Sequence, residues 1–152
     1  MTASPFSPFT IGPLTLKNRF IKTATNEGMA RNGGVPSKML ARFHERIAAG
    51  GIAMTTVAYC AVSTDGKTFV DQVELNRESV PHLRALTDAV HRHGAAASAQ
   101  ITHGGCFTFL PQVSTGLPLS ASGGFNKVGV LSGRWLRRSM DRDAMTMIAD
   151  QF

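Results

Sequence analysis

Long apolar runs, cysteine clusters and an export signal are all missing from this sequence. It has no apolar run of about 18 residues, so we expect no transmembrane helix and no membrane partner. Its two cysteines, Cys60 and Cys106, form no CxxC pair and no metal-ligand spacing, so we expect no metal site. Two unpaired thiols suit a reducing compartment. Since the opening MTASPFSPF has neither a basic nor an apolar segment, no secretory signal is expected, and we expect a cytoplasmic protein.

A strong charge bias is also missing over most of the chain, although the formal net charge is +6. With 43% hydrophobic and 17% charged residues, the 152-residue chain fits one soluble domain. Basic residues cluster only at Arg134, Arg137 and Arg138, around Trp135, a mixture that occurs on nucleic-acid-binding surfaces. A solvated loop explains this cluster more simply, so we expect no nucleic-acid partner.

Strand and helix patterns alternate along the chain. The order predicted is a hairpin at about 9–17, strands at about 18–25, 52–60 and 95–102, and helices at about 36–49, 79–93 and 141–152. Gly12-Pro13 supplies the hairpin turn, and glycines at 50, 51 and 94 end the first two helices. A repeated strand–helix–strand order predicts right-handed crossovers and a parallel sheet.

Finer features of these elements can also be predicted. Apolar stripes at helical spacing should be buried, namely Leu40, Phe43 and Ile47 in the first helix and Leu83, Leu86 and Val90 in the second. Ser79 and Asp141 are the expected N-caps of the last two helices. Lys22 is expected at the rim of the sheet, and the alternative is a buried amine. The segment from Phe107 to Arg138 is rich in Gly, Ser and Pro and has no period, so we expect a long irregular excursion.

The third strand changes character abruptly. Small residues from Ala95 to Ala99 suit the crowded interior of a closed parallel barrel, and Gln100, Thr102 and His103 then follow. Barrel enzymes keep their chemistry at the carboxyl ends of the strands. A glutamine there can donate and accept hydrogen bonds, and could bind the edge of a heteroaromatic ring. The alternative is a buried strand with an exposed polar end.

Three segments in this order carry a resemblance to a known family. They are PFTIGPLTLKNRFIKTAT, GGIAMTTVAYCAVSTDG and AQITHGG. Together they resemble the Old Yellow Enzyme family of FMN-dependent NAD(P)H oxidoreductases, which includes the ene reductases. The resemblance implies an α/β fold: the N-terminal part of a TIM (β/α)8 barrel with a β-hairpin lid. Residues 1–152 would form the N-terminal segment of a single FMN-binding barrel that is incomplete in this chain.

The resemblance also assigns residues to the flavin. These are Ala24, Thr25, Asn26, Ala58, Tyr59, Gln100 and His103. The backbone of the first two would face the flavin ring, and Asn26 would lie near its O4 and N5 edge. The backbone at Ala58 and Tyr59 would approach the pyrimidine side.

The last two residues belong to one motif of the family. Gln100 matches the glutamine that hydrogen-bonds the pyrimidine ring, and His103 matches the histidine of the motif Q-L-x-H-x-G-R. Cys106 stands where that motif usually ends in arginine.

The activity implied is hydride transfer from NAD(P)H through flavin N5 to an activated alkene. No catalytic residue is expected within this chain, because the family's substrate-binding histidine pair, phosphate site and proton donor follow later strands. We therefore expect the chain to be inactive by itself and to need the remainder of the barrel in trans or a homo-oligomer. The alternative is a non-catalytic fragment that acts in assembly through its open sheet edge.

Overall fold

Parallel strands form the centre of the molecule. The computed structural model describes residues 4–31, 33–110 and 116–152. The central sheet contains β3 (Ile21–Lys22), β6 (Met54–Ala61), β7 (Val73–Glu74) and β8 (Ala96–Thr102). β6 lies in the middle, with β3 parallel to its beginning, β7 parallel to its end, and β8 along its other side. The chain therefore has α/β architecture, and the sheet does not close into a barrel within the described residues.

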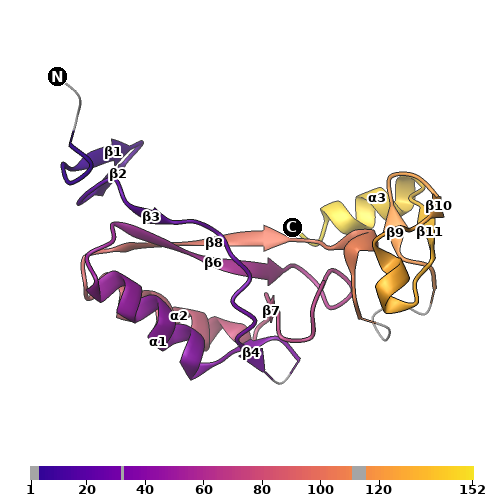
Figure 1. Cartoon of the computed structure of the whole chain (residues 1–152), viewed down its shortest axis with the longest axis horizontal. Helices are drawn as coiled ribbons and strands as arrows, with labels where there is room; N and C mark the ends of the chain where they lie inside the picture. Colours follow the sequence, from indigo (N-terminus) through magenta and orange to yellow (C-terminus); the bar gives the residue numbers. More distant parts are fainter. Residues whose placement is uncertain (1–3, 32, 111–115) are drawn as a thin grey trace.

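Two helices cover one face of this sheet (Figure 1). They are α1 (Lys38–Ala49) and α2 (Ser79–His91). α1 begins where the Ser37 hydroxyl accepts a hydrogen bond from the Leu40 N–H at 3.2 Å. The chain leaves the two helices through Gly51 and Gly94, whose φ angles of 97° and 64° favour glycine. Helix, glycine and strand thus follow one another as the sequence pattern indicates.

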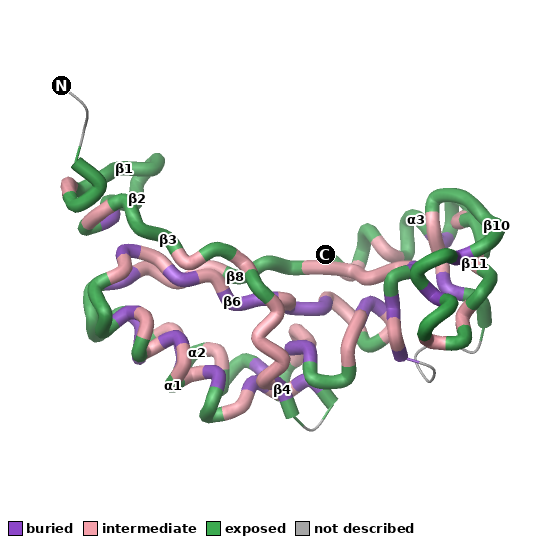
Figure 2. The backbone as a smooth tube through the Cα atoms, viewed as in Figure 1, coloured by how far each residue is buried: buried purple, intermediate pink, exposed green. Residues whose placement is uncertain are grey.

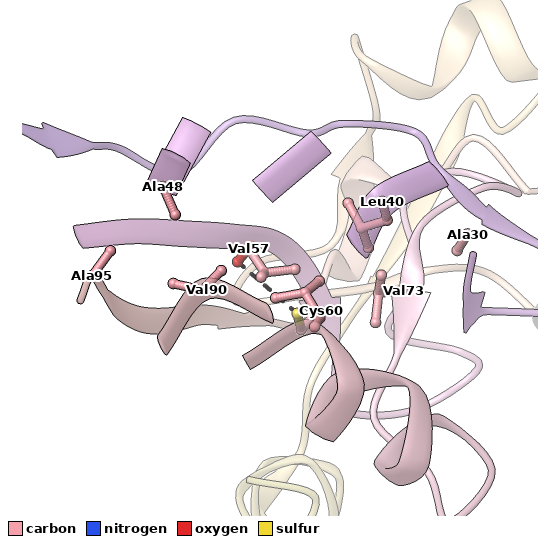
Figure 3. Close-up of a cluster of buried hydrophobic side chains, with 9 residues drawn as sticks. Ala30, Leu40, Ala48, Val57, Cys60, Val73, Val90 and Ala95 are labelled. Atoms are coloured by element: carbon pink, nitrogen blue, oxygen red, sulfur yellow. Dashed lines mark hydrogen bonds between the residues drawn. The ribbon is translucent and has the colours of Figure 1, made fainter. Parts of the chain in front are cut away.

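The core lies between these helices and β6. Figure 3 shows side chains from both helices and from β6 and β7 meeting there, among them Leu40, Val57, Cys60, Val73 and Val90. Thr55 and Val57 alternate on the helix-facing side of β6, and the register shift after Val57 makes Cys60 the next residue of β6 in the core. Burial is least on the outer strands, where β3 and much of β8 are exposed or half-buried while β6 is mostly buried (Figure 2).

Two hairpins flank the sheet. β1 (Phe9–Ile11) and β2 (Leu14–Leu16) are antiparallel and joined through Gly12-Pro13. β4 (Ala30–Arg31) and β5 (Val35–Pro36) form a second, short antiparallel pair, which the sequence pattern does not predict. It stands between the first strand and α1.

The segment after β8 is more ordered than expected. Residues 111–115 of the expected excursion lie outside the described residues. The rest contains β9 (Leu119–Ser120), β10 (Gly124–Phe125) and β11 (Leu136–Ser139), which form a small sheet with β11 in the middle. One turn of 3-10 helix at Gly105–Phe107 follows β8, and another at Gly129–Ser132 lies between β10 and β11. The prediction of an irregular loop, including the basic segment around Trp135, is therefore wrong for the described part.

Some element boundaries also differ from the sequence pattern. The strand expected at about 18–25 is only Ile21–Lys22, because the Asn18 side chain instead bonds the Gly51 carbonyl at 2.8 Å and the Phe20 N–H at 3.0 Å. The last helix, α3 (Arg142–Ala149), is shorter than the expected 141–152. Its cap is Asp141, which accepts a hydrogen bond from the Ala144 N–H at 2.8 Å.

Several side chains occupy places that the sequence pattern does not predict. Ser79 is not an N-cap, because Glu78 precedes it in the capping position and the Ser79 hydroxyl donates to the Asn76 carbonyl at 2.8 Å. In α1 the buried stripe is Leu40, His44 and Ala48, whereas Phe43 and Ile47 are only half-buried. Lys22 is not a rim residue, since it is largely buried in an ion pair with Glu27.

Candidate functional site

The carboxyl ends of the first three parallel strands lie side by side. Lys22 pairs with Thr55, and the chain then follows β6 until the Glu27 N–H donates to the Ala58 carbonyl at 3.3 Å. Ala24, Thr25 and Asn26 therefore run along the end of β6. On its other side Val57 pairs with Ala99 and Cys60 with Ile101.

Gln100 consequently lies beside Ala58 and Tyr59, where the register shifts by one residue and the Ala58–Tyr59 peptide bond is cis. The structure thus brings together six of the seven residues assigned to the flavin. We call this group the strand-tip cluster: Ala24, Thr25, Asn26, Ala58, Tyr59 and Gln100.

Gln100 faces away from the helices. The Ser98 and Thr56 hydroxyls meet at 2.8 Å on the side of the sheet opposite the helix-facing Thr55, and alternation puts Gln100 on the same side as Ser98. Its side chain is exposed and forms no hydrogen bond with any residue in the described ranges. Its donor and acceptor are both available to a ligand.

Asn26 supplies a buried polar atom at the same place. Its Oδ1 is buried and has no hydrogen-bond partner among the described residues. Unpaired buried acceptors cost free energy in a folded protein. An N–H of a ligand could donate a hydrogen bond to this oxygen. Asn26 is therefore a stronger candidate for ligand binding than its residue type alone suggests.

His103 is the seventh of these residues, and it follows directly on the end of β8. Its Nδ1 accepts a hydrogen bond from the Gly105 N–H at 3.1 Å, and its Nε2 lies 3.9 Å from Asp65 Oδ2. A Cβ at Gly66 would come within 2.8 Å of the imidazole. The contacts of His103 are thus with Gly105 after β8 and with the loop that follows β6, and any contact with flavin stays a prediction.

Position 106 departs from the family motif, and the basic side chain of Arg137, from β11, lies next to it. Cys106 is buried, and Arg137 Nη1 from β11 lies 4.0 Å from its Sγ. The Cys106 carbonyl accepts a hydrogen bond from Asn126 Nδ2 at 2.9 Å. The small sheet after β8 therefore brings a guanidinium next to the side chain at position 106.

A buried ionic network underlies the strand-tip cluster, and sequence reasoning missed it. The Glu27 carboxylate pairs with Lys22, and its Oε2 accepts a hydrogen bond from the Ala58 N–H at 3.1 Å. His44 Nε2 lies 3.9 Å from the same carboxylate, and His44 Nδ1 is 2.7 Å from the Thr55 hydroxyl. Burial raises the pKa of Glu27, but His44, Lys22 and the Ala58 N–H outweigh it, so the pKa lies below its ordinary value of 4.5.

This network could have been suspected from the sequence by one signal only. Glu27 follows directly on the polar end of the first strand, where a charged residue is usually solvated. No local sequence feature indicates that the Glu27 carboxylate accepts a hydrogen bond from the N–H of Ala58, 31 residues later.

Comparison with known proteins identifies the family. The model of the NADH:flavin oxidoreductase / NADH oxidase family matches residues 4–148. The chain belongs to this family. The resemblance to the Old Yellow Enzymes is thereby confirmed.

Relatives with described activities are longer than this chain. It is 53% identical over 104 residues to 4,4'-dithiodibutanoate disulfide reductase of Rhodococcus erythropolis, covering 68% of this chain and 26% of that protein. It is 40% identical over 98 residues to a multifunctional alkene reductase/demethylase of Caballeronia cordobensis, covering 63% of this chain and 14% of the relative. The chain thus spans about a quarter or less of these two proteins.

Solved structures support the fold. An Old Yellow Enzyme homologue from Zymomonas mobilis matches with a TM-score of 0.81 at 22% identity, over 98% of this chain and 43% of that one. Morphinone reductase in complex with tetrahydroNAD matches with a TM-score of 0.83 at 17% identity, over 99% and 44% of the two chains. The open sheet with its two helices is therefore the N-terminal part of a TIM barrel. None of the helices in the described ranges is long and apolar enough to cross a membrane.

Proposed function

We propose that these residues form part of the FMN site of an NAD(P)H-dependent oxidoreductase of the ene-reductase type. The strand-tip cluster carries this proposal, because it gathers an unpaired buried acceptor at Asn26 and a free amide at Gln100 on neighbouring strand ends. Catalytic groups of TIM barrels stand at this end of the strands. The family match supports the flavin, and the donor chemistry of the cluster supports its pyrimidine edge as the part bound here.

The residues of the chain would bind and orient the ring. FMN, when bound, supplies the hydride chemistry between a nicotinamide and an electrophilic substrate. Gln100 would hydrogen-bond the pyrimidine edge, and Asn26 Oδ1 would accept from a ring N–H. The peptides at Ala24, Thr25, Ala58 and Tyr59 would form the wall against which the ring lies. Fixed dipoles along this edge stabilise negative charge on the reduced ring without reorganising.

The rest of the site would come from outside these 152 residues. β8 is bonded to β6 on one side only, and Ile101 on it is 47% exposed. We infer that the remainder of the barrel, on the same polypeptide or in trans, pairs with this edge and brings the phosphate site and the proton donor. A second copy of the chain, or a purely structural partner, is the alternative occupant of the edge.

The substrate has two candidates. The alkene reductase relative favours an activated alkene, which takes up a hydride at one carbon and a proton at the other. The Rhodococcus relative, at 53% identity, favours an organic disulfide, in which a hydride displaces a thiolate from sulfur and leaves one thiol and one thiolate. Alkene reduction would be measured as a loss of alkene absorbance. Disulfide reduction would be measured as an appearance of free thiol.

The flavin proposal is tested by NMR titration of the ¹⁵N-labelled chain with FMN. We expect shift changes concentrated at the backbone amides of the strand-tip cluster, and the same pattern with riboflavin, because the phosphate site lies elsewhere. Gln100→Leu should weaken binding by about tenfold, since one hydrogen bond to a charged or polar ring edge is lost. Ile101→Leu, next to it on the opposite face, should bind like the unchanged chain.

Two results would each contradict one part of the proposal. An absence of shift changes at the cluster at saturating FMN would contradict the flavin site. Stoichiometric FMN binding with NADPH oxidation by the 152-residue chain without any partner would contradict the inference that the rest of the site comes from outside these residues.

A further inference from the structure

Regular pairing between the first two parallel strands ends early. The β3–β6 ladder has two residue pairs, Ile21 with Met54 and Lys22 with Thr55. The tip of the first strand continues for several residues beyond this point. Something other than the ladder must therefore hold the two tips together where the ring is proposed to lie.

Glu27 makes that connection through the peptide groups of one residue. Its carboxylate Oε2 accepts from the Ala58 N–H at 3.1 Å, and its own N–H donates to the Ala58 carbonyl at 3.3 Å. Lys22 adds a third link, since its Nζ donates to the Thr56 carbonyl at 3.1 Å. Both polar groups of Ala58 are therefore engaged by Glu27.

The carboxylate that makes this contact is itself held firmly. The Glu27 side chain is only 4% exposed and is paired with Lys22. His44 stands behind it on α1, fixed by the Thr55 hydroxyl. Charge-assisted hydrogen bonds in such a desolvated place are stronger than those at a surface. Glu27 thus links the first strand, the second strand and α1 directly beneath the strand-tip cluster.

We propose that Glu27 is a positioning residue: its carboxylate fixes the Ala58 N–H at the Val57–Ala58 peptide, and through Ala58 it fixes the pyrimidine side of the flavin. This inference rests on the proposed flavin site. Because the Ala58 N–H is already committed to Glu27, Ala58 would act by its position and not as a donor to the ring. The hydrogen bonds to the ring at this edge would then come mainly from Gln100 and Asn26.

Amide hydrogen exchange on the ¹⁵N-labelled full chain tests the first half of this inference, with no flavin needed. In Glu27→Ala the Ala58 amide should exchange at least about tenfold faster, because a charge-assisted hydrogen bond is lost. Amides of β8 such as Ala97 should keep their rates. Glu27→Gln retains an acceptor and should restore most of the protection. Glu45→Ala, which removes an exposed carboxylate of α1 paired with Arg92, is the matched control and should leave Ala58 unchanged.

FMN titration of the same variants tests the second half. Glu27→Ala should lower the affinity for FMN by about tenfold, with Glu27→Gln in between, and Glu45→Ala should bind normally. The inference is overturned if Ala58 exchange does not change, or if β6 and β8 amides accelerate equally in Glu27→Ala, since that pattern reports a general loss of stability. It is also overturned if the Ala58 amide exchanges faster in Glu27→Ala while the affinity for FMN stays the same.

The two proposals can fail separately. If the unchanged chain shows no FMN shifts, the proposed flavin site is wrong, and the exchange data still decide whether Glu27 holds Ala58. If FMN binds at the cluster but Glu27→Ala binds it equally well, the flavin site stands and the positioning role does not.

Discussion

Replacing Thr55 by valine should lower the free energy of unfolding, because His44 would lose its hydrogen-bond partner in a buried place. Both residues are completely buried, and the Thr55 hydroxyl lies 2.7 Å from His44 Nδ1. The two groups form a hydrogen bond whichever of them carries the hydrogen. Valine has nearly the same shape as threonine, so the substitution removes this hydrogen bond and creates almost no cavity.

The expected cost follows from what is left behind. His44 Nε2 already has no hydrogen-bond partner among the described residues, and the substitution would leave Nδ1 without one as well. A buried polar group left unsatisfied costs about 1–3 kcal/mol. For a chain of this length, a loss of about 2 kcal/mol lowers the melting temperature by about 4–8 °C.

Urea denaturation followed by far-UV circular dichroism measures this free energy. Thr87→Val is the matched control, because the Thr87 hydroxyl donates to the Arg84 carbonyl at an exposed position of α2, and it should cost less than about 0.5 kcal/mol. Pairing Thr55→Val with His44→Leu should recover part of the loss, since no buried nitrogen is then stranded. Equal costs for Thr55→Val and Thr87→Val would refute the reasoning.

Three further predictions concern pH, packing and thiol reactivity. The folded-state pKa of Glu27 is lowered, so its stabilisation is complete above pH 4.5 and is lost as the pH falls through the folded value. Urea titrations at decreasing pH should therefore show a smaller acid loss in Glu27→Gln than in the unchanged chain, and equal slopes would contradict this. Leu86→Ala, at a fully buried position, should cost about 2–5 kcal/mol in the same assay, whereas Leu117→Ala at an exposed one should cost far less. Burial, with the charge of Glu27, raises the pKa of the Cys60 thiol to about 11, so in a Cys106→Ser background iodoacetamide at neutral pH should label Cys60 only after unfolding. Rapid labelling of the folded chain would be inconsistent with that burial.

The regular elements and the family could be predicted because their signals are local. Glycines after each helix, the stripe through Leu86 and Val90 and the apolar run of β6 each reflect a short-range periodicity. Parallel pairing puts the three strand tips at one edge of the sheet, and the family resemblance assigns Gln100 and Ala58 to one site there. The small sheet after β8 could not be predicted, because β9, β10 and β11 are two to four residues long and too short to show a period.

The sequence by itself determined the alternation of strands and helices, the membership of the flavin oxidoreductase family and the polar character of the strand ends. Only the tertiary structure decided that Glu27 is buried beneath those ends, that it bonds Ala58, and that His44 faces it from α1. The reason is physical. A periodic pattern records which face of an element is apolar, whereas the partner of a buried charge depends on the register between segments far apart in the chain, and no local pattern contains that register.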